Sequence, residues 1–140
     1  MSEMTTAVRA FLQEVHFAVV ATLRSDGMPH QTVMWYQLLD ENTVLLNTPF
    51  DSLKHRHLKA DPRISICIEQ GYRYVTLRGT AQLDESPEQA GQHYAQLGQR
   101  YRDTFPARAS QSAGERPAIL NRPRVTLWVT IDAVQASGFE

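Results

Sequence analysis

The chain has 140 residues and a formal net charge of −1 at pH 7. Its length predicts a single domain over residues 1–140, and its near-neutral charge argues against a protein that binds nucleic acid by neutralising phosphates over a broad surface. The N-terminus lacks a basic segment followed by an apolar one, and no apolar run approaches the roughly 20 residues that span a bilayer. We therefore expect a cytoplasmic protein that does not bind membranes.

The first part of the chain predicts one helix followed by three strands. The helix is capped at residues 5–6 and carries apolar residues at helical spacing. The pattern then changes to β-rich runs over residues 17–24 and 30–39, which the turn chemistry of residues 25–29 joins into a hairpin. A short strand is predicted over residues 43–47.

A short basic helix follows and ends before Asp61-Pro62. Its apolar face is predicted to comprise Phe50, Leu53, Leu58 and Ala60. At about 3.6 residues per turn, Lys54 and His57 project within the same sector, whereas His55 and Lys59 point away. An ammonium beside an apolar face costs desolvation unless an anion compensates it or its head reaches water. The pattern thus leaves two interpretations of Lys54, an anion-binding residue or a cation that extends into solvent.

Two further strands are predicted at residues 63–69 and 72–83, separated by a turn at Gln70-Gly71. The single cysteine, Cys67, lies in an isoleucine-rich run that predicts full burial, and it has no partner for an internal disulfide. Gly79 within the second of these strands predicts a bulge or a bend.

The last part of the chain predicts a helix, a long loop and a final strand. The helix opens at Ser86-Pro87 and runs toward Tyr101. Residues 102–123 contain three prolines and predict a loop, with room for a helical turn at residues 117–120. An alternating strand follows at residues 124–131. Six strands with a few short helices favour a mainly β fold, a small antiparallel barrel, over a sandwich or a parallel sheet.

Common catalytic and metal-binding patterns are absent from the sequence. No serine lies in a nucleophile elbow, no glycines form a phosphate loop, and no histidine has ligands at metal-binding spacing, so we expect no metal site and identify no catalytic residue. Anion binding at the start of the basic helix remains, by Asn47, Thr48 and Ser52 with Lys54 and Arg56. Simple helix capping explains Thr48 and Ser52 equally well.

The strand at residues 30–39 carries two rows of side chains. Gln31, Val33 and Trp35 share one face, and Thr32, Met34 and Tyr36 share the other. In a small barrel one of these rows points outward. The two aromatic residues fit a core or a dimer interface, or a planar cofactor laid across the strand.

Short motifs occur in a fixed order between Phe17 and Ile131. They are Ala21-Thr22-Leu23-Arg24 with Asp26-Gly27-Met28-Pro29, then Asn47-Thr48, Ser52-x-Lys54 and Asp61-Pro62-Arg63, then Tyr72-Arg73-Tyr74-Val75-x-Leu77-x-Gly79-x-Ala81. Their order and spacing resemble the split β-barrel flavin and deazaflavin proteins related to pyridoxamine 5′-phosphate oxidase. The resemblance implies a six-stranded Greek-key split β-barrel that forms a homodimer, with two cofactor sites along the interface.

The resemblance also implies which residues bind the cofactor. Contacts to the isoalloxazine or deazaflavin ring are implied for Gln31, Thr32, Val33, Met34 and Trp35. Contacts to the phosphate are implied for Asn47, Thr48, Ser52 and Lys54, with Arg56 as a weaker candidate. Tyr74 matches a strand position that reaches the cofactor, from the neighbouring subunit.

Departures from the family pattern point to one branch of it. Pyridoxamine phosphate oxidases proper carry an arginine and a lysine on the ring-binding strand, where this chain has Thr32 and Gln37, and their C-terminal Trp-rich, Arg-x-His signature is missing. The compact length and the Ser52-x-Lys54 form resemble more closely the branch that binds the deazaflavin F420. We expect an F420-dependent oxidoreductase that transfers hydride from the reduced deazaflavin to a small unsaturated organic acceptor. The alternatives are an FMN-binding oxidoreductase of the same fold and a non-catalytic flavin- or haem-binding module.

Overall fold

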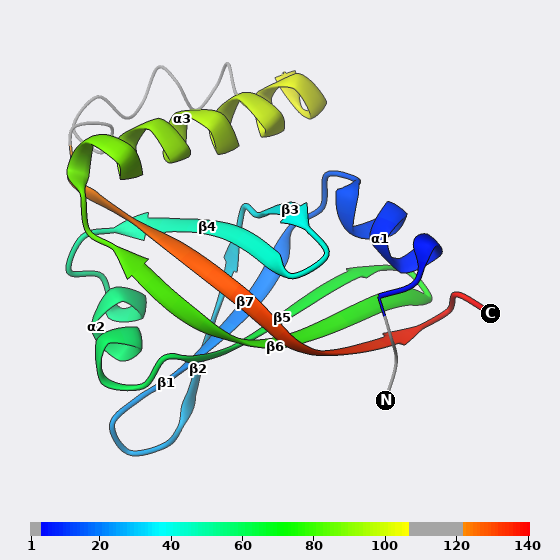
Figure 1. Cartoon of the computed structure of the whole chain (residues 1–140), viewed down its shortest axis with the longest axis horizontal. Coiled ribbons are helices and arrows are strands. Elements are labelled where there is room, and N and C mark those ends of the chain that lie inside the picture. The colour runs from blue at the N-terminus through cyan, green and yellow to red at the C-terminus, as the bar shows by residue number, and fades with distance from the viewer. Residues whose placement is uncertain (1–3, 107–121) are drawn as a thin grey trace.

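A computed structural model of the chain describes residues 4–106 and 122–140. Its strands form one antiparallel sheet in the order β2-β1-β5-β6-β7-β4-β3, with three α-helices around it (Figure 1). The helices are α1 (Thr6–Gln13), α2 (Leu53–Ala60) and α3 (Pro87–Thr104). The strands are β1 (Ala18–Leu23), β2 (Pro29–Met34), β3 (Gln37–Asp40), β4 (Thr43–Pro49), β5 (Arg63–Gln70), β6 (Arg73–Asp84) and β7 (Arg124–Ser137). The predicted mainly β split-barrel fold is thus confirmed.

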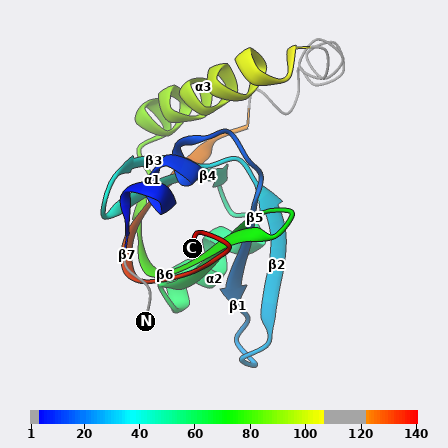
Figure 2. The ribbon, with the colours of Figure 1, turned by 90° about the vertical axis from the view of Figure 1, so that its right-hand side faces the viewer.

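The sheet curls into a barrel because two strands that are consecutive in sequence lie at its opposite edges. β2 pairs with β1 at one edge, whereas β3 pairs with β4 at the other. The chain crosses between these edges at Trp35-Tyr36, and the strands surround a common interior when viewed from the end (Figure 2). The single strand predicted at residues 30–39 is therefore two strands, which gives seven strands in the described part of the chain instead of the predicted six.

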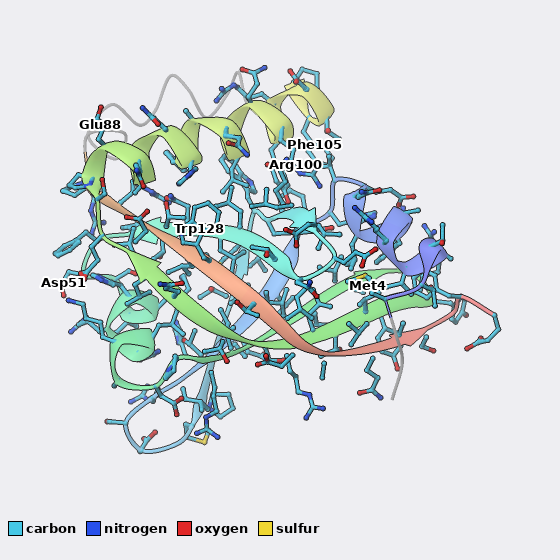
Figure 3. The ribbon with its side chains drawn as sticks, viewed as in Figure 1. Met4, Asp51, Glu88, Arg100, Phe105 and Trp128 are labelled. Carbon is cyan, nitrogen blue, oxygen red and sulfur yellow. The ribbon has the colours of Figure 1, made fainter. Side chains whose placement is uncertain are left out.

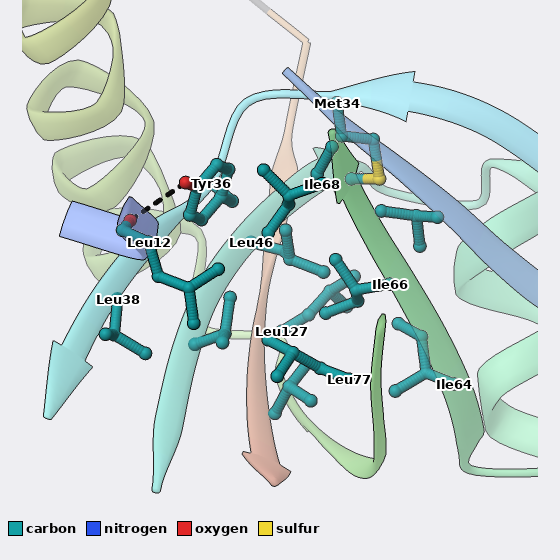
Figure 4. Packing of buried hydrophobic residues seen from close by; sticks show 14 of the residues in the cluster. Leu12, Met34, Tyr36, Leu38, Leu46, Ile64, Ile66, Ile68, Leu77 and Leu127 are labelled. Atoms are coloured by element: carbon teal, nitrogen blue, oxygen red, sulfur yellow. Dashed lines mark hydrogen bonds between the residues drawn. The ribbon is translucent and has the colours of Figure 1, made fainter. Parts of the chain in front are cut away.

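The crossing is fixed by hydrogen bonds of Tyr36, which has no exposed surface. Its hydroxyl donates to the Leu12 carbonyl oxygen at 2.8 Å (Figure 4). Its backbone N–H donates to the Tyr101 hydroxyl oxygen at 3.1 Å. Backbone groups that leave a sheet in a buried region need such partners. The chain therefore leaves the sheet where α3 supplies partners for the Tyr36 backbone, through the Tyr101 hydroxyl and Arg100 Nε, while α1 accepts the Tyr36 hydroxyl.

The barrel interior is filled by aliphatic side chains from alternate positions of the strands (Figure 4). On β5, Ile64, Ile66 and Ile68 face the core, each with 4% or less of its surface exposed. Burying one such side chain contributes roughly 1.5–3 kcal/mol. Cys67 lies on the opposite, outer face and is only half-buried, so the prediction that it is a core residue is wrong.

Gly79 permits a close approach between β6 and β7. The register of the two strands shifts between Arg78 and Gly79, which confirms the predicted bulge. A Cβ atom on Gly79 would lie 2.3 Å from the carbonyl oxygen of Thr130, far closer than real Cβ contacts. Beyond the shift β7 continues to Ser137, six residues past the predicted end of this strand.

The helices occupy different sides of the barrel. α2 and α1 lie at its two ends, and α3 lies along the outside of β4 and β7 (Figures 1 and 2). The ring of Trp128 from β7 contacts His93 of α3, with 4.9 Å between ring centroids (Figure 3). α3 extends beyond the predicted helix end, and residues 107–121, with the possible turn at 117–120, lie outside the described residues. No helix in the described ranges is long and apolar enough to cross a membrane.

Candidate functional site

The loop before α2 is held by its own polar side chains. Asp51 adopts a positive φ of 63° immediately before the helix (Figure 3). The Ser52 hydroxyl caps α2 by accepting the N–H of His55 at 3.3 Å, and it lies 2.9 Å from the hydroxyl of Thr48. The capping interpretation of Ser52 is thus confirmed. The side-chain hydrogen bonds described for these two residues therefore stay within the protein: the hydroxyls of Thr48 and Ser52 bond to each other, and Ser52 also accepts the N–H of His55.

His55 faces the barrel, which contradicts the predicted outward orientation. Only 1% of its surface is exposed, and its Nδ1 accepts the backbone N–H of Asp51 at 2.8 Å. Phe50 and Leu53, predicted on the buried face, are 42% and 48% exposed. The left-handed residue Asp51 turns the chain so that the helix begins at Leu53, and His55 and Leu58 then occupy its inner face.

Lys54 is a half-buried cation in this end of the barrel. Burial and the nearby charge of Arg124 hold the pKa of its ammonium below the ordinary value. The other cations of α2 have carboxylate neighbours, because Lys59 lies 3.3 Å from Glu85 and Arg56 lies 3.8 Å from Asp51. Within residues 4–106 and 122–140, no carboxylate lies within ion-pair distance of Lys54. Arg56 is exposed and already paired, so its environment differs from that of Lys54.

Arg124 is a candidate residue that the sequence did not reveal. It pairs with Pro49 at the end of the β4–β7 ladder, and its charge acts on Lys54. Its Nε donates to the side-chain oxygen of Asn47 at 2.6 Å, and its guanidinium lies 3.8 Å from the ring centroid of Tyr94. Burial, opposed in part by Tyr94, lowers the pKa of this guanidinium. In the sequence Arg124 is only the first residue of a strand, and its neighbours depend on a register that no local pattern indicates.

Asn47 is occupied by contacts within the protein. It has 7% of its surface exposed, its side-chain nitrogen donates to the Ala90 carbonyl at 2.9 Å, and its oxygen accepts from Arg124. These bonds connect β4, β7 and α3. Asn47 therefore contacts Arg124 with its side-chain oxygen, while its side-chain nitrogen bonds to α3.

The five residues predicted to contact a cofactor ring divide between different surfaces. Gln31 and Val33 point outward, whereas Thr32 and Met34 face the interior, where Met34 is buried. The Thr32 hydroxyl is buried and has no hydrogen-bond partner among the described residues. Trp35 stacks against Tyr101 of α3, with 5.1 Å between ring centroids. The structure thus does not bring the whole set to one surface.

Tyr74 belongs to an outer surface that no helix of the described chain covers. We call it the open face, formed by the outer sides of β2, β1, β5 and β6. Its exposed large side chains are Val19 (37%), Val33 (65%) and Tyr74 (41%). Val19 and Val33 are direct cross-strand partners. Val19, Val33 and Tyr74 thus give the open face exposed apolar surface.

Two histidines meet at the end of the barrel near α2. His57 Nδ1 lies 2.9 Å from the hydroxyl of Thr22, and its ring centroid lies 5.5 Å from that of His30. Burial, followed by the charges of His30 and nearby cations, lowers the pKa of His57. Across the described ranges, no group of three or more histidine, cysteine or acidic residues is arranged to hold a metal ion.

Comparisons with known proteins agree with this architecture. The model of the family described as pyridoxamine 5′-phosphate oxidase matches residues 4–138. A pyridoxine/pyridoxamine 5′-phosphate oxidase of Rubrobacter xylanophilus is 30% identical over 138 residues, covering 87% of this chain and 63% of that protein. The chain thus spans less than two thirds of the length of this relative.

Two solved structures are similar over most of their length. An F420 reductase superimposes with a TM-score of 0.72 and 25% identity, covering 91% of this chain and 94% of that chain. A conserved hypothetical protein from Mycobacterium tuberculosis superimposes with a TM-score of 0.73 and 28% identity, covering all of this chain and 86% of its own.

Proposed function

The chain belongs to the pyridoxamine 5′-phosphate oxidase family, and on that premise we propose that it is an F420-dependent oxidoreductase. The proposed reaction transfers hydride from the reduced deazaflavin to a small unsaturated organic acceptor. The family implies a flavin-type cofactor, F420 or FMN. Similarity to an F420 reductase over 91% of the chain favours the deazaflavin.

The observation that carries this proposal is the environment of Lys54. A half-buried ammonium without a described acidic partner is costly, and its lowered pKa reports that cost. Phosphate oxygens at this position would compensate the charge, which fits a phosphorylated cofactor. Arg56 is not needed for this role, because Asp51 already lies beside it.

The residues on the barrel wall also fit such a group. The unpaired hydroxyl of Thr32 is a polar atom available to a ligand on the ring-binding strand. When bound, a reduced deazaflavin supplies hydride from its C5 atom. The chain would hold the phosphate with Lys54, orient the ring system from β2 and limit the access of water. We assign no proton donor.

The direct test is a titration of the purified protein with F420 and with FMN, followed by fluorescence. We expect F420 to bind more tightly. Tight FMN binding without F420 binding would refute the proposal. Acceptor-dependent oxidation of reduced F420 is then expected, and its absence with a broad set of unsaturated acceptors would favour the non-catalytic flavin- or haem-binding module.

The relative from Rubrobacter xylanophilus favours a second candidate, an FMN-binding oxidoreductase of the same fold. Purification as a yellow protein would support it. We propose that even then the substrate is not pyridoxamine 5′-phosphate, since Thr32 and Gln37 stand where pyridoxamine phosphate oxidases proper carry cations. Oxidation of pyridoxamine 5′-phosphate by the FMN-loaded protein would contradict this.

We propose further that the protein is a homodimer that associates through the open face. Large apolar side chains clustered on one surface are typical of an interface, and α3 covers β4 and β7 but not this side. Val33→Asp is expected to shift the protein toward the monomer in sedimentation velocity. Met28→Asp, at an equally exposed residue in the β1–β2 turn, is the matched control. A wild-type monomer at micromolar concentration would refute the proposal.

A further inference from the structure

We propose that Arg124 is a second anion-binding residue of the Lys54 site and that Asn47 positions its guanidinium for this role. The ligand class is a phosphate ester or another tetrahedral oxyanion. That this oxyanion belongs to a flavin-type cofactor rests on the proposed function, whereas binding of the oxyanion itself does not.

The contacts of Arg124 leave its terminal nitrogens available. Asn47 accepts the Nε–H at 2.6 Å, and Tyr94 covers one face of the guanidinium plane. No described residue accepts a hydrogen bond from either terminal nitrogen, and no described carboxylate pairs with Arg124. These two nitrogens form the edge of the guanidinium that binds phosphate oxygens in a bidentate manner. Arg124 is therefore oriented but not neutralised.

The fold holds Arg124 close to Lys54. Pro49 and Arg124 are partners at the end of the β4–β7 ladder, and the N–H of Phe50 donates to the Pro123 carbonyl at 2.9 Å. This bond ties the loop before α2 to the first residues of β7. Lys54 lies in the first turn of α2, directly after that loop. Lys54 and Arg124 thus come from two segments, the start of α2 and the start of β7, that the end of the β4–β7 ladder brings together.

Two half-buried cations whose charges repel each other are electrostatically unfavourable without an anion. The charge of Arg124 contributes to the lowered pKa of Lys54, and burial lowers the pKa of both residues. A protein retains such an arrangement at a cost in stability. A bound oxyanion would reverse the cost, because it attracts both cations at once.

Asn47 acts through Arg124 and not on the ligand. It is 7% exposed, and its amide joins the Arg124 guanidinium to the Ala90 carbonyl of α3. This arrangement replaces the direct phosphate contact that the family resemblance implies for Asn47. An aspartate at this position would place a carboxylate against Arg124 and neutralise it within the protein.

The test compares ligands with and without a phosphate. FMN and riboflavin differ only in this group, so the ratio of their affinities reports the phosphate contribution separately from ring binding. We expect Arg124→Gln to reduce this ratio about tenfold or more, since hydrogen bonds to charged groups contribute on this scale. Arg124→Lys should recover part of it. Arg102→Gln, which removes an equal charge from an exposed residue of α3, is the control and should leave the ratio unchanged.

Variants of Asn47 provide the test of positioning. We expect Asn47→Ala, which removes the oxygen that accepts the Arg124 Nε–H, to lower the affinity ratio, and Asn47→Asp to lower it further because its carboxylate neutralises the retained arginine. An unchanged ratio in Arg124→Gln, in a variant whose thermal unfolding matches the wild type, would overturn the anion-binding role. An unchanged ratio in Asn47→Ala would overturn the positioning role.

A separate measurement distinguishes failure of this inference from failure of the proposed function. Inorganic phosphate is titrated into the protein while the NMR signal of the Lys54 side chain is followed. If neither F420 nor FMN binds but phosphate perturbs Lys54 in the wild type and not in Arg124→Gln, the cofactor proposal fails and the oxyanion site stands. If phosphate perturbs Lys54 equally in both proteins, the role of Arg124 is refuted.

Discussion

The hydroxyl of Tyr36 donates a 2.8 Å hydrogen bond to the carbonyl oxygen of Leu12, which fastens α1 to the crossing between β2 and β3. Removing this hydroxyl in Tyr36→Phe leaves a buried carbonyl without its partner. We expect a loss of roughly 1–3 kcal/mol in the free energy of unfolding, measured by urea denaturation. Tyr72→Phe removes the same group from a residue that is 97% exposed and should have no effect. Equal stabilities of the two variants would contradict the role given to this bond.

Gly79→Ala should destabilise the barrel. The added methyl group would meet the Thr130 carbonyl oxygen at 2.3 Å, so β6 and β7 must separate. Overpacking of this kind costs roughly 1–3 kcal/mol. Gly91→Ala is the matched control, because nothing lies within 4 Å of its added methyl and α3 should gain about 0.5–1 kcal/mol. Opposite shifts of the thermal midpoint are expected, and a shift in the same direction would contradict the prediction.

Lys54→Ala is expected to weaken binding of the phosphorylated cofactor about tenfold. Arg56→Ala removes the same charge two residues away, from an exposed side chain beside Asp51, and should change the affinity little. Fluorescence titration measures both. Lys54→Ala should unfold no more readily than the wild type, because the ammonium is desolvated at a cost. Equal losses of affinity in the two variants would indicate a general charge effect instead of a specific contact.

The lowered pKa of Lys54 gives binding a pH dependence. Burial and Arg124 disfavour the protonated amine in the folded protein, so between the folded and the unfolded pKa the unfolded chain binds more protons and stability rises with pH. A bound anion raises this pKa again. Binding should therefore take up protons at pH values between the Lys54 pKa of the free protein and that of the complex, and affinity should fall as pH rises through this range.

Calorimetric titrations in buffers of different ionisation enthalpy measure this proton uptake. Lys54→Arg is the control variant, because a guanidinium stays charged over the same range. Uptake that persists unchanged in Lys54→Arg would assign the proton to another group.

Most strands of the barrel were predictable because their patterns are local. Runs of β-branched residues bounded by turns predict β1, β4, β5 and β6. The glycine at position 79 predicts the register shift between β6 and β7. The division at Trp35-Tyr36 was not predictable in this way. Those two residues favour strands by composition, and the interruption depends on Leu12 and Tyr101, which are distant in sequence.

The candidate site was predictable only in part, because some of its contacts depend on how distant segments of the chain come together. Lys54 stood out because a cation shared a helical face with apolar residues. The burial of His55 could not be foreseen, since it follows from the positive φ of Asp51 and not from helical periodicity. Arg124 gained its significance from its pairing with Pro49, a register that only the folded sheet defines.

The crossing at Trp35-Tyr36 also bears on the order in which the protein folds. The bond between the Tyr36 N–H and Tyr101 joins residues 65 positions apart, so it can form only after a long segment has been ordered. The barrel should therefore close late, after α3 has docked against β7. In chevron kinetics, Tyr101→Phe, which removes the hydroxyl that accepts this bond, should then accelerate unfolding more than it slows folding. The lifetime of the folded state should therefore depend on the crossing, where the chain passes from one edge of the sheet to the other.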